Sequence, residues 1–428
     1  MPIRALLLLI ALAPTLAAQI GADPLGDHAP AWIEFYRDLH RHPELSFREA
    51  KTAEKLAAAF TAAGFEVTSH VGGTGVVAVL HNGEGPTLLL RCDMDALPVG
   101  ERTGLEYRSE VRVEGDDGRV GGVMHACGHD LHMTALAATS TWLATHRESW
   151  RGTLVCIGQP AEERAGGAKA MLEDGLFERF PRPDYAVAMH VTPDLPAGTV
   201  GVRAGPAMAN VESVDVTIHG RGGHGAAPHL TIDPIPIACR LVLDLQTIVS
   251  REIAPTSPAV VTVGSIVGGS KHNIIDDECR LQITIRSYDP QVHEHIKEAI
   301  VRKAKAAAAS SGAGEPDVAF SEFTPAMVND DRLTDRCRTA FRDELGAAAV
   351  VDVDAVMTAE DFGRLRLAGI PICMFRLGTT APARLEAARR AGQPLAPLHS
   401  GGYYPDVEQC LPTAVRALAS AALHLLPR

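Results

Sequence analysis

The segment TLVCIGQPAEERAGGAKAMLEDGLF (153–177) contains the pattern that decides the fold class. It begins with a short apolar run typical of a buried strand, passes through the polar turn QPAEER (159–164) and continues with a helical pattern. The same alternation is found elsewhere, with strand-like runs at 87–90 and 185–189 and a helical stretch at 131–146. Buried strands that alternate with helices predict an α/β fold with a largely parallel sheet.

The pattern changes near residue 210. VESVDVTIHG (211–220) alternates like a half-buried strand, and a helix, two strands, a long helix and a last strand follow it. This β-α-β-β-α-β order is typical of a ferredoxin-like unit. We therefore expect a discontinuous α/β domain over residues 19–208 and 322–428, with an α+β unit over residues 209–321 inserted into it.

A further helix is predicted over SFREAKTAEKLAAAFTAAG (46–64). Ser46 and Glu49 have the spacing of a capping box, in which a serine side chain caps the first turn. Gly64 is a typical stop signal. The pattern therefore predicts that Ser46 marks the start of this helix.

Composition and charge exclude several classes of protein. The 428 residues include 40 Lys+Arg and 52 Asp+Glu, a net charge of −12, which argues against a partner such as nucleic acid or an anionic membrane surface. MPIRALLLLIALAPTLAA (1–18) has the layout of a secretory signal peptide with cleavage near Ala18, and an uncleaved buried helix is the alternative. Its apolar run is far shorter than the roughly 20 residues of a membrane span. We therefore expect an exported protein, periplasmic or secreted.

The segment MHACGHDLH (124–132) concentrates side chains that bind metals. Cys127 and His129 are two residues apart, a spacing at which a non-helical loop can direct both toward one metal centre. Thiolate and imidazole suit zinc and its neighbours. A redox or nucleophilic cysteine, or a polar loop without a role, are the alternatives.

Three more candidate positions follow predicted strands or precede the last helix. Glu162 and Glu163 come directly after a strand, and in extended backbone their side chains would point in different directions. One could then bind a metal while the other acts as a general base, although an exposed acidic pair is the alternative. His190 ends a strand-like run, and His399 lies in a loop before the closing helix. Each histidine alone is more typical of a structural role, and the metal-ligand interpretation depends on the other candidates.

Two other pairs of polar residues are candidates. Asp93 and Asp95 follow a predicted strand and could bind a metal or orient a ligating histidine, although a structural turn is the alternative for Asp93. His224 and His229 lie in a glycine-rich loop of the inserted unit. Glycines allow close approach of a substrate to the backbone, but they are also found in a plain tight turn.

Taken together, these motifs resemble one known family. The chain is similar to the amidohydrolase branch of the di-metal aminoacylase/carboxypeptidase family, which holds hippurate hydrolases, N-acyl-amino-acid deacylases and auxin-conjugate hydrolases. The resemblance spans residues from about 30 to 420. The motifs that carry it are HPELSFRE (42–49), DMDALP (93–98), MHACGHD (124–130), QPAEE (159–163), GGHGAAPH (222–229), GGSKHN (268–273), MTAEDF (357–362) and LHS (398–400).

The resemblance implies a site with two divalent metal ions per chain. The mixed Cys and His donors favour zinc, and manganese, cobalt and nickel stay open. Glu162 matches the catalytic glutamate, and Asp95 matches an acid that lies behind the ligands. The residues that match the metal ligands are Cys127, His129, Glu163, His190 and His399.

In the inserted unit, the resemblance implies residues that contact the substrate. His224 matches a histidine that relatives lend across a dimer interface to stabilise the oxyanion. Asn273 and Arg286 match residues that hold the substrate carboxylate, and His229 is a further substrate-binding candidate. The implied fold is a zinc-peptidase-like α/β domain, its sheet mixed and mostly parallel, with a ferredoxin-like lid that also forms a homodimer.

The predicted reaction is hydrolysis of the amide bond of a small N-acyl amino acid by a water that two metal ions activate. Glu162 would accept the proton of this water. A metallo-carboxypeptidase or dipeptidase that uses the same centre is an alternative. An exported small-ligand binding protein with a vestigial metal site is an alternative of another class.

Overall fold

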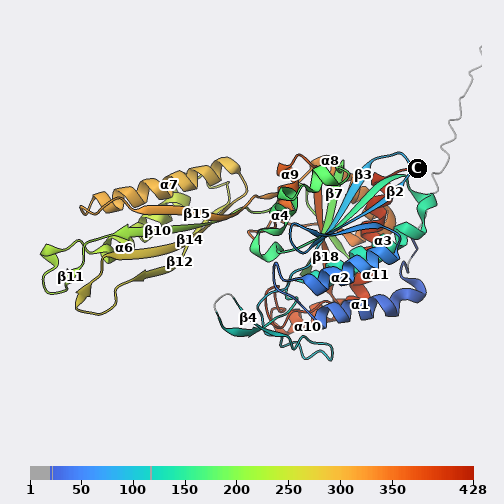
Figure 1. Cartoon of the computed structure of the whole chain (residues 1–428), viewed down its shortest axis with the longest axis horizontal. Helices are drawn as coiled ribbons and strands as arrows, with labels where there is room; N and C mark the ends of the chain where they lie inside the picture. The colour runs from blue at the N-terminus through green and yellow to red at the C-terminus, as the bar shows by residue number, and fades with distance from the viewer. Residues whose placement is uncertain (1–19, 22, 116–117) are drawn as a thin grey trace, which may run out of the picture.

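An eight-stranded mixed sheet forms the centre of the larger of two units in the computed structural model, which describes residues 20–21, 23–115 and 118–428 (Figure 1). The predicted signal peptide lies outside the described residues. The strands, in their order across the sheet, are β1 (Glu66–Val71), β2 (Gly75–Asn82), β6 (Gly152–Gln159), β3 (Thr87–Asp93), β7 (Tyr185–Pro196), β18 (Ile372–Thr380), β8 (Val200–Val202) and β17 (Val350–Asp352).

The middle of this sheet is parallel. β6, β3, β7 and β18 pair with one another in parallel, whereas β1, β2 and β6 pair antiparallel and so do β18 and β8. The apolar run Leu88–Leu90 is fully buried in β3 because helices cover both faces of the sheet. The predicted α/β class with a mixed, mostly parallel sheet is confirmed.

Two hydrophobic cores, one on each face, hold the helices to the sheet. None of the described helices combines the length and the apolarity of a membrane span. One face packs against α1 (Ala29–Arg41), α2 (Ala50–Ala62), α3 (His129–Thr145), α8 (Asp331–Leu345) and α11 (Val407–Leu425), and the other against α4 (Gly167–Glu173), α5 (Leu176–Arg179) and α9 (Gly363–Leu367). Outside these layers lie α10 (Pro382–Ala391), β4 (Arg112–Glu114) and β5 (Val120–Gly122).

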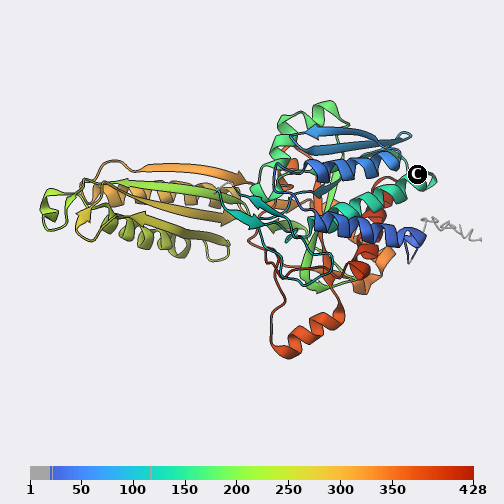
Figure 2. The same ribbon diagram turned by 60° about the horizontal axis from the view of Figure 1, so that its bottom comes forward.

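The second unit is a slender lid that extends away from the sheet domain (Figures 1 and 2). Helices α6 (Pro234–Thr247) and α7 (Pro290–Ala309) share one core with its four-stranded antiparallel sheet, and the element order is ferredoxin-like. The strands, in sheet order, are β12 (Ala259–Gly268), β14 (Glu278–Ser287), β10 (Val211–His219) and β15 (Asp317–Thr324). A two-stranded ribbon of β11 (Gly223–His224) and β13 (Ile274–Ile275) lies at the end away from the sheet domain.

Two linkers join the units side by side. β9 (Gly205–Met208) leads into the lid and pairs antiparallel with β16 (Met327–Asn329), which leads out of it. Strand β15 runs beyond the expected lid boundary at residue 321, because Thr324 still pairs with Val211 at the root of the lid.

The predicted capping box is wrong. Helix α2 begins at Ala50, after Glu49, and the side chain that accepts an N–H of its first turn is Glu44, which bonds the Thr52 N–H (2.8 Å). The Ser46 hydroxyl instead donates a hydrogen bond to Asp95 (2.6 Å), and the Glu49 carboxylate accepts the backbone N–H groups of Phe47 and Ala161. Both side chains therefore support the loops above the sheet rather than the helix.

A buried ion triad ties α1 to the first turn of α3. Nδ1 of His40 lies 2.7 Å from Asp130, and its Nε2 lies 3.1 Å from Glu101. Burial disfavours the charged form of His40, but the two carboxylates outweigh burial and raise the pKa of its imidazole to about 9. The charged imidazole therefore stabilises the folded state.

This triad predicts a pH-dependent stability. The contribution of His40 is complete below its unfolded-state pKa of about 6.5 and disappears as the pH rises through about 9, a total of about 3 kcal/mol. Urea unfolding of wild type and His40→Gln, both with excess chelator, should therefore give free energies of unfolding that converge between pH 6 and pH 9. The exposed His42→Gln is the control, and a His40→Gln deficit that stays constant over this range would contradict the account.

Candidate metal centre

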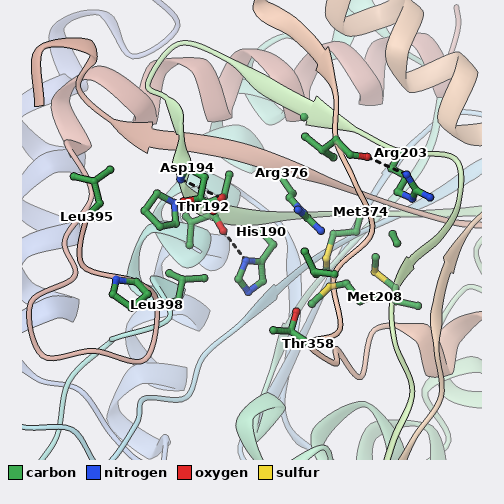
Figure 3. Close-up of a pocket in the computed structure, with 18 residues that line it drawn as sticks. His190, Thr192, Asp194, Arg203, Met208, Thr358, Met374, Arg376, Leu395 and Leu398 are labelled. Carbon is green, nitrogen blue, oxygen red and sulfur yellow. Dashed lines mark hydrogen bonds between the residues drawn. The ribbon is translucent and has the colours of Figure 1, made fainter. Parts of the chain in front are cut away.

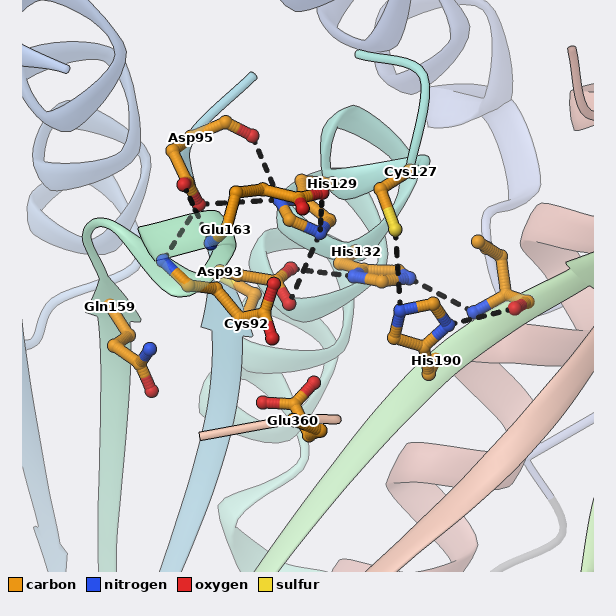
Figure 4. A network of polar contacts seen from close by, with 12 residues as sticks. Cys92, Asp93, Asp95, Cys127, His129, His132, Gln159, Glu163, His190 and Glu360 are labelled. Carbon is orange, nitrogen blue, oxygen red and sulfur yellow. Dashed lines mark hydrogen bonds and ion pairs between the residues drawn. The ribbon is translucent and has the colours of Figure 1, made fainter. Parts of the chain in front are cut away.

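All five residues that sequence analysis assigned to metal binding meet above the carboxyl edge of the central sheet. Figure 4 shows four of them, Cys127, His129, Glu163 and His190. Cys127 lies in the loop before α3, and His129 is the first residue of that helix. Glu163 follows β6, His190 lies within β7 and His399 lies in the loop before α11. The site therefore joins segments from most of the length of the larger unit.

The ligand atoms form two groups that share one thiol. Cys127 with His129 and His190 form one group, and Cys127 with Glu163 and His399 form the other, each with its ligand atoms within 4.8 Å of one another. Sγ of Cys127 lies 3.6 Å from Nε2 of His190, and Nε2 of His399 lies 3.3 Å from Oε1 of Glu163. The arrangement can hold two adjacent cations, and Cys127 is a candidate ligand of both.

Backbone carbonyls fix the tautomers of two of the histidines. Nδ1 of His129 lies 2.8 Å from the carbonyl oxygen of Asp95, and Nδ1 of His190 lies 2.8 Å from that of Val191. A carbonyl only accepts, so both Nδ1 atoms carry the proton and both Nε2 atoms present a lone pair. Neutral imidazoles oriented in this way are metal ligands.

His132 is excluded by the same argument. Its Nδ1 donates to Asp93 (2.6 Å), and its Nε2 accepts the backbone N–H of Val191 (3.0 Å). Both ring nitrogens are therefore occupied, although this histidine belongs to the same cysteine- and histidine-rich motif. Asp93 orients His132 and also accepts a hydrogen bond from Arg91. Its carboxylate therefore holds residues that surround the candidate ligands.

The electrostatics of the centre favour bound cations. Nε2 of His129 and Oε1 of Glu163 are buried, and among the described residues neither atom has a partner that meets hydrogen-bond geometry. Burial, Glu163 and Glu162 raise the pKa of the Cys127 thiol well above its usual value. Burial disfavours a charge on His129, yet the carboxylates of Asp93, Asp95 and Glu163 raise its pKa to about 10. Positive charge is needed here, and divalent ions would supply it and keep the thiol deprotonated.

Glu162 is the spare carboxylate beside the two groups. One of its oxygens lies within 4.8 Å of the ligand atoms of His129 and Glu163, and it also faces Glu360 and Asp361. Burial and these neighbouring carboxylates raise the pKa of Glu162 well above its usual range. It therefore lies within reach of the centre without belonging to the shared-cysteine groups.

Unusual backbone conformations place these residues. Gly128 has φ +76, and a Cβ there would approach Val191 to 2.7 Å, so only glycine fits between Cys127 and His129. We expected extended backbone at Glu162 and Glu163. They lie instead in the short 3-10 helix η3 (Glu162–Arg164). Left-handed Ala161 and Ala165 flank this turn, which is local strain of the kind found at functional sites.

Asp95 holds this turn against the ligand loop. Its carboxylate accepts the backbone N–H groups of Glu162 (3.1 Å) and Glu163 (3.0 Å) and the hydroxyl of Ser46. Its own carbonyl orients His129. Asp95 thus lies behind the ligands, at the place that the resemblance implied.

One expectation about β7 is wrong. His190 does not end the strand, because β7 continues to Pro196 alongside β18. The pairing of β7 with β3 ends at Ala188, so His190 lies just past the edge of that neighbour.

Sequence analysis missed a buried network beneath Glu162. The guanidinium of Arg91 donates to Asp93 (2.7 Å), Glu360 (2.7 Å), Asp361 (3.2 Å) and Gln159 (3.0 Å). The MTAEDF motif (357–362) contains two members of this network, Glu360 and Asp361, to which the sequence analysis assigned no role. Burial lowers the pKa of Arg91, but the three carboxylates outweigh burial and raise it, so the Arg91 guanidinium is a fixed positive charge under the site.

The lid residues are not brought together with the metal centre. Arg286 lies at the root of the lid, where its Nη1 donates to the carbonyl of Met357 (2.8 Å). His224 and Asn273 lie at the opposite end, in the ribbon where the Gly225 N–H donates to the Asn273 carbonyl (2.9 Å), and His229 follows in the same loop. The ten residues of β14, about 33 Å, separate the two ends. Within one chain, Asn273 and Arg286 therefore cannot hold the same carboxylate.

Comparisons with known proteins identify the family to which the chain belongs. The model of peptidase family M20/M25/M40 matches residues 89–389. The chain belongs to this family. It is 36% identical to a thermostable carboxypeptidase of Saccharolobus solfataricus, over 81% of this chain and 85% of that protein. It is also 36% identical to an N-acetyl-L-cysteine deacetylase of Bacillus subtilis, over 77% and 76%.

Solved structures of the M20 family share the fold. The crystal structure of the Bacillus subtilis YXEP protein, described as a dinuclear metal-binding peptidase from the M20 family, matches with a TM-score of 0.77 and 30% identity, over 93% of this chain and 98% of that one. The predicted resemblance is thus confirmed, and this M20 chain is a hydrolase of amide bonds.

The shared thiol predicts a specific loss of metal. Cys127→Ala removes a ligand from both groups, so the metal content after dialysis against a weak chelator should fall well below that of wild type. Elemental analysis measures it. Cys92→Ala is the matched control, because Cys92 is also a buried thiol near the site but bonds only to the Ile157 carbonyl. Wild-type metal content in Cys127→Ala would contradict the assignment.

Proposed function

We propose that the chain hydrolyses N-acyl amino acids to a carboxylic acid and a free amino acid. The observation that carries this proposal is an uncommitted carboxylate, Glu162, beside a full set of five ligand residues. A binding protein has no use for a proton acceptor at this point. The deacetylase among the relatives supports an N-acyl amino acid as the substrate.

The donor set fits two divalent cations per chain. Such a pair would polarise the scissile carbonyl and lower the pKa of the attacking water. The mixture of thiol, imidazole and carboxylate favours zinc, with manganese, cobalt and nickel as the other candidates. Cys127, His129 and His190 would hold one ion, and Cys127, Glu163 and His399 the other.

Glu162 moves the proton. Its carboxylate accepts a proton from the attacking water and delivers it to the nitrogen of the leaving amino acid, so that the amide C–N bond breaks without a charged amide anion. Asp95 keeps Glu162 in place through the backbone of η3. Arg286, at the root of the lid, supplies a charge-assisted contact for the carboxylate of the amino acid.

His224 must come from a second subunit in this scheme. The tip of the lid lies far from the metal centre of its own chain (Figures 1 and 2). The lid also offers a self-pairing surface: β12 is an edge strand with exposed Ile266 and Val267, and Leu243 on the adjacent α6 is 69% exposed. A homodimer through this edge, in which the partner's tip completes each site, accounts for these features.

A substrate panel tests the proposed reaction. Metal-depleted protein is given zinc, manganese, cobalt or nickel and assayed on N-acetyl, N-benzoyl and indole-acetyl amino acids and on dipeptides. We expect turnover of N-acyl amino acids that disappears with chelator, and a loss of at least 100-fold in Glu162→Gln with metal content retained.

The exposed Glu173→Gln is the control for that variant. Turnover of dipeptides alone would assign the chain to the peptidase alternative. More than a tenth of the wild-type rate in Glu162→Gln would contradict the general-base role.

Subunit complementation tests the partner's contribution. His224→Ala is expected to be nearly inactive because removal of an oxyanion donor costs about 10²–10³ in rate, and Glu162→Gln because it lacks the proton acceptor. Unfolded and refolded together, they form mixed dimers in which one of the two sites is intact, so the mixture should recover about a quarter of wild-type activity. No recovery in a mixture that contains mixed dimers would show that His224 does not act across the interface.

A further inference from the structure

A cavity of about 320 Å³ opens directly beside His190 (Figure 3). The reaction scheme above leaves it unused. Its walls are mostly apolar and come from β7, β18, the two linkers and the loop before α11; they include Met208, Met327, Met374, Val356, Leu395 and Leu398. A cavity of this size and character suits a short organic chain that reaches away from the scissile amide.

One cation projects into this apolar cavity. Arg376 lies in β18 directly opposite His190 in β7, and side chains of such a pair share one face of the sheet. Figure 3 shows its guanidinium between the His190 ring and Met374. A group bound at the metals through its carbonyl would therefore extend past Arg376.

The Arg376 guanidinium makes no hydrogen bond or ion pair with the described residues, although the carboxylates of Asp194 and Asp354 lie close enough to act on its charge. Its Nη2 is buried and has no hydrogen-bond partner. Burial lowers the pKa of this guanidinium, which nonetheless stays charged at neutral pH. The other arginine of the cavity is already engaged, because Arg203 donates to the carbonyls of Pro206 (2.6 Å) and Val353 (3.2 Å). Asp194 lines the cavity at its exposed side and makes no ion pair with Arg376 among the described residues.

A partly buried guanidinium with a buried, unbonded Nη2 is costly, and an anionic ligand relieves that cost through charge-assisted hydrogen bonds. We propose that Arg376 is a specificity-determining residue that binds a second carboxylate of the substrate, at the end of a short chain in the cavity beside His190. This inference rests on the proposed function and narrows it to dicarboxylate N-acyl amino acids. The second carboxylate belongs either to the acyl group or to the side chain of the amino acid.

Isosteric substrate pairs separate the two sources. N-succinyl-L-alanine is compared with its terminal carboxamide, and N-acetyl-L-glutamate with N-acetyl-L-glutamine. Wild type should favour the carboxylate member of one pair by about 10- to 100-fold in kcat/KM, mostly through KM. Arg376→Met should remove this preference and Arg376→Lys should keep part of it. The pair that responds identifies the source of the carboxylate.

Arg203→Met is the matched control, because Arg203 lines the same cavity but its N–H groups already donate to backbone carbonyls. This variant should leave the kcat/KM ratio within each substrate pair unchanged. Calorimetric binding of the same pairs to Glu162→Gln protein reads the preference without turnover, and thermal unfolding checks the fold of each variant. Equal kcat/KM and equal Kd within both pairs in the wild type, or a preference that survives in Arg376→Met, would overturn the inference. Hydrolysis of the neutral members with no preference would overturn it while the proposed function stands.

Discussion

Negative charge collected at the carboxyl edge of one sheet is the constraint on which the larger unit depends. Cys127, Glu162, Glu163, Asp93 and Asp95 lie close together in a largely buried place. A buried charge costs several kcal/mol unless it is paired, so the fold must supply positive charge and hydrogen-bond donors around these groups. Arg91 supplies it from below, and two cations are the counterpart above.

The backbone around the site shows how firmly this arrangement is held. Gly128 lies where a side chain would clash with Val191, and two alanines on either side of η3 adopt left-handed conformations. Such strain persists only where surrounding contacts over-determine it. Asp95 provides those contacts, since one carboxylate fixes the η3 turn and one carbonyl fixes the His129 tautomer.

The sequence predicted the components of the site better than their arrangement. The α/β class and the inserted ferredoxin-like unit could be predicted from the pattern of strands and helices, whereas the five ligand residues followed from the resemblance of the motifs to a known family. The tautomers of His129 and His190 could not, because they depend on carbonyls supplied by other segments. Ser46 was misread as a helix cap because local spacing cannot reveal a carboxylate 49 positions away. His132 resembles a ligand in sequence, and only its two hydrogen bonds exclude it.

The lid and the cavity show a different limit of sequence reasoning. The family resemblance assigns both His224 and Arg286 to the substrate-binding site, whereas the length of β14 separates them by placing them at opposite ends of the lid. Arg376 belongs to no motif, and its position opposite His190 follows only from strand register. Residues that decide substrate choice in this fold are thus fixed by tertiary pairing, and motifs alone do not find them.

The paired cation centre is the central claim, and anomalous X-ray diffraction from metal-loaded crystals tests it most directly. The account predicts two peaks about 3.5–4 Å apart, one beside His129 and His190 and the other beside Glu163 and His399, with the Cys127 sulfur between them. A single peak, or peaks at Asp93 and His132 instead, would contradict it.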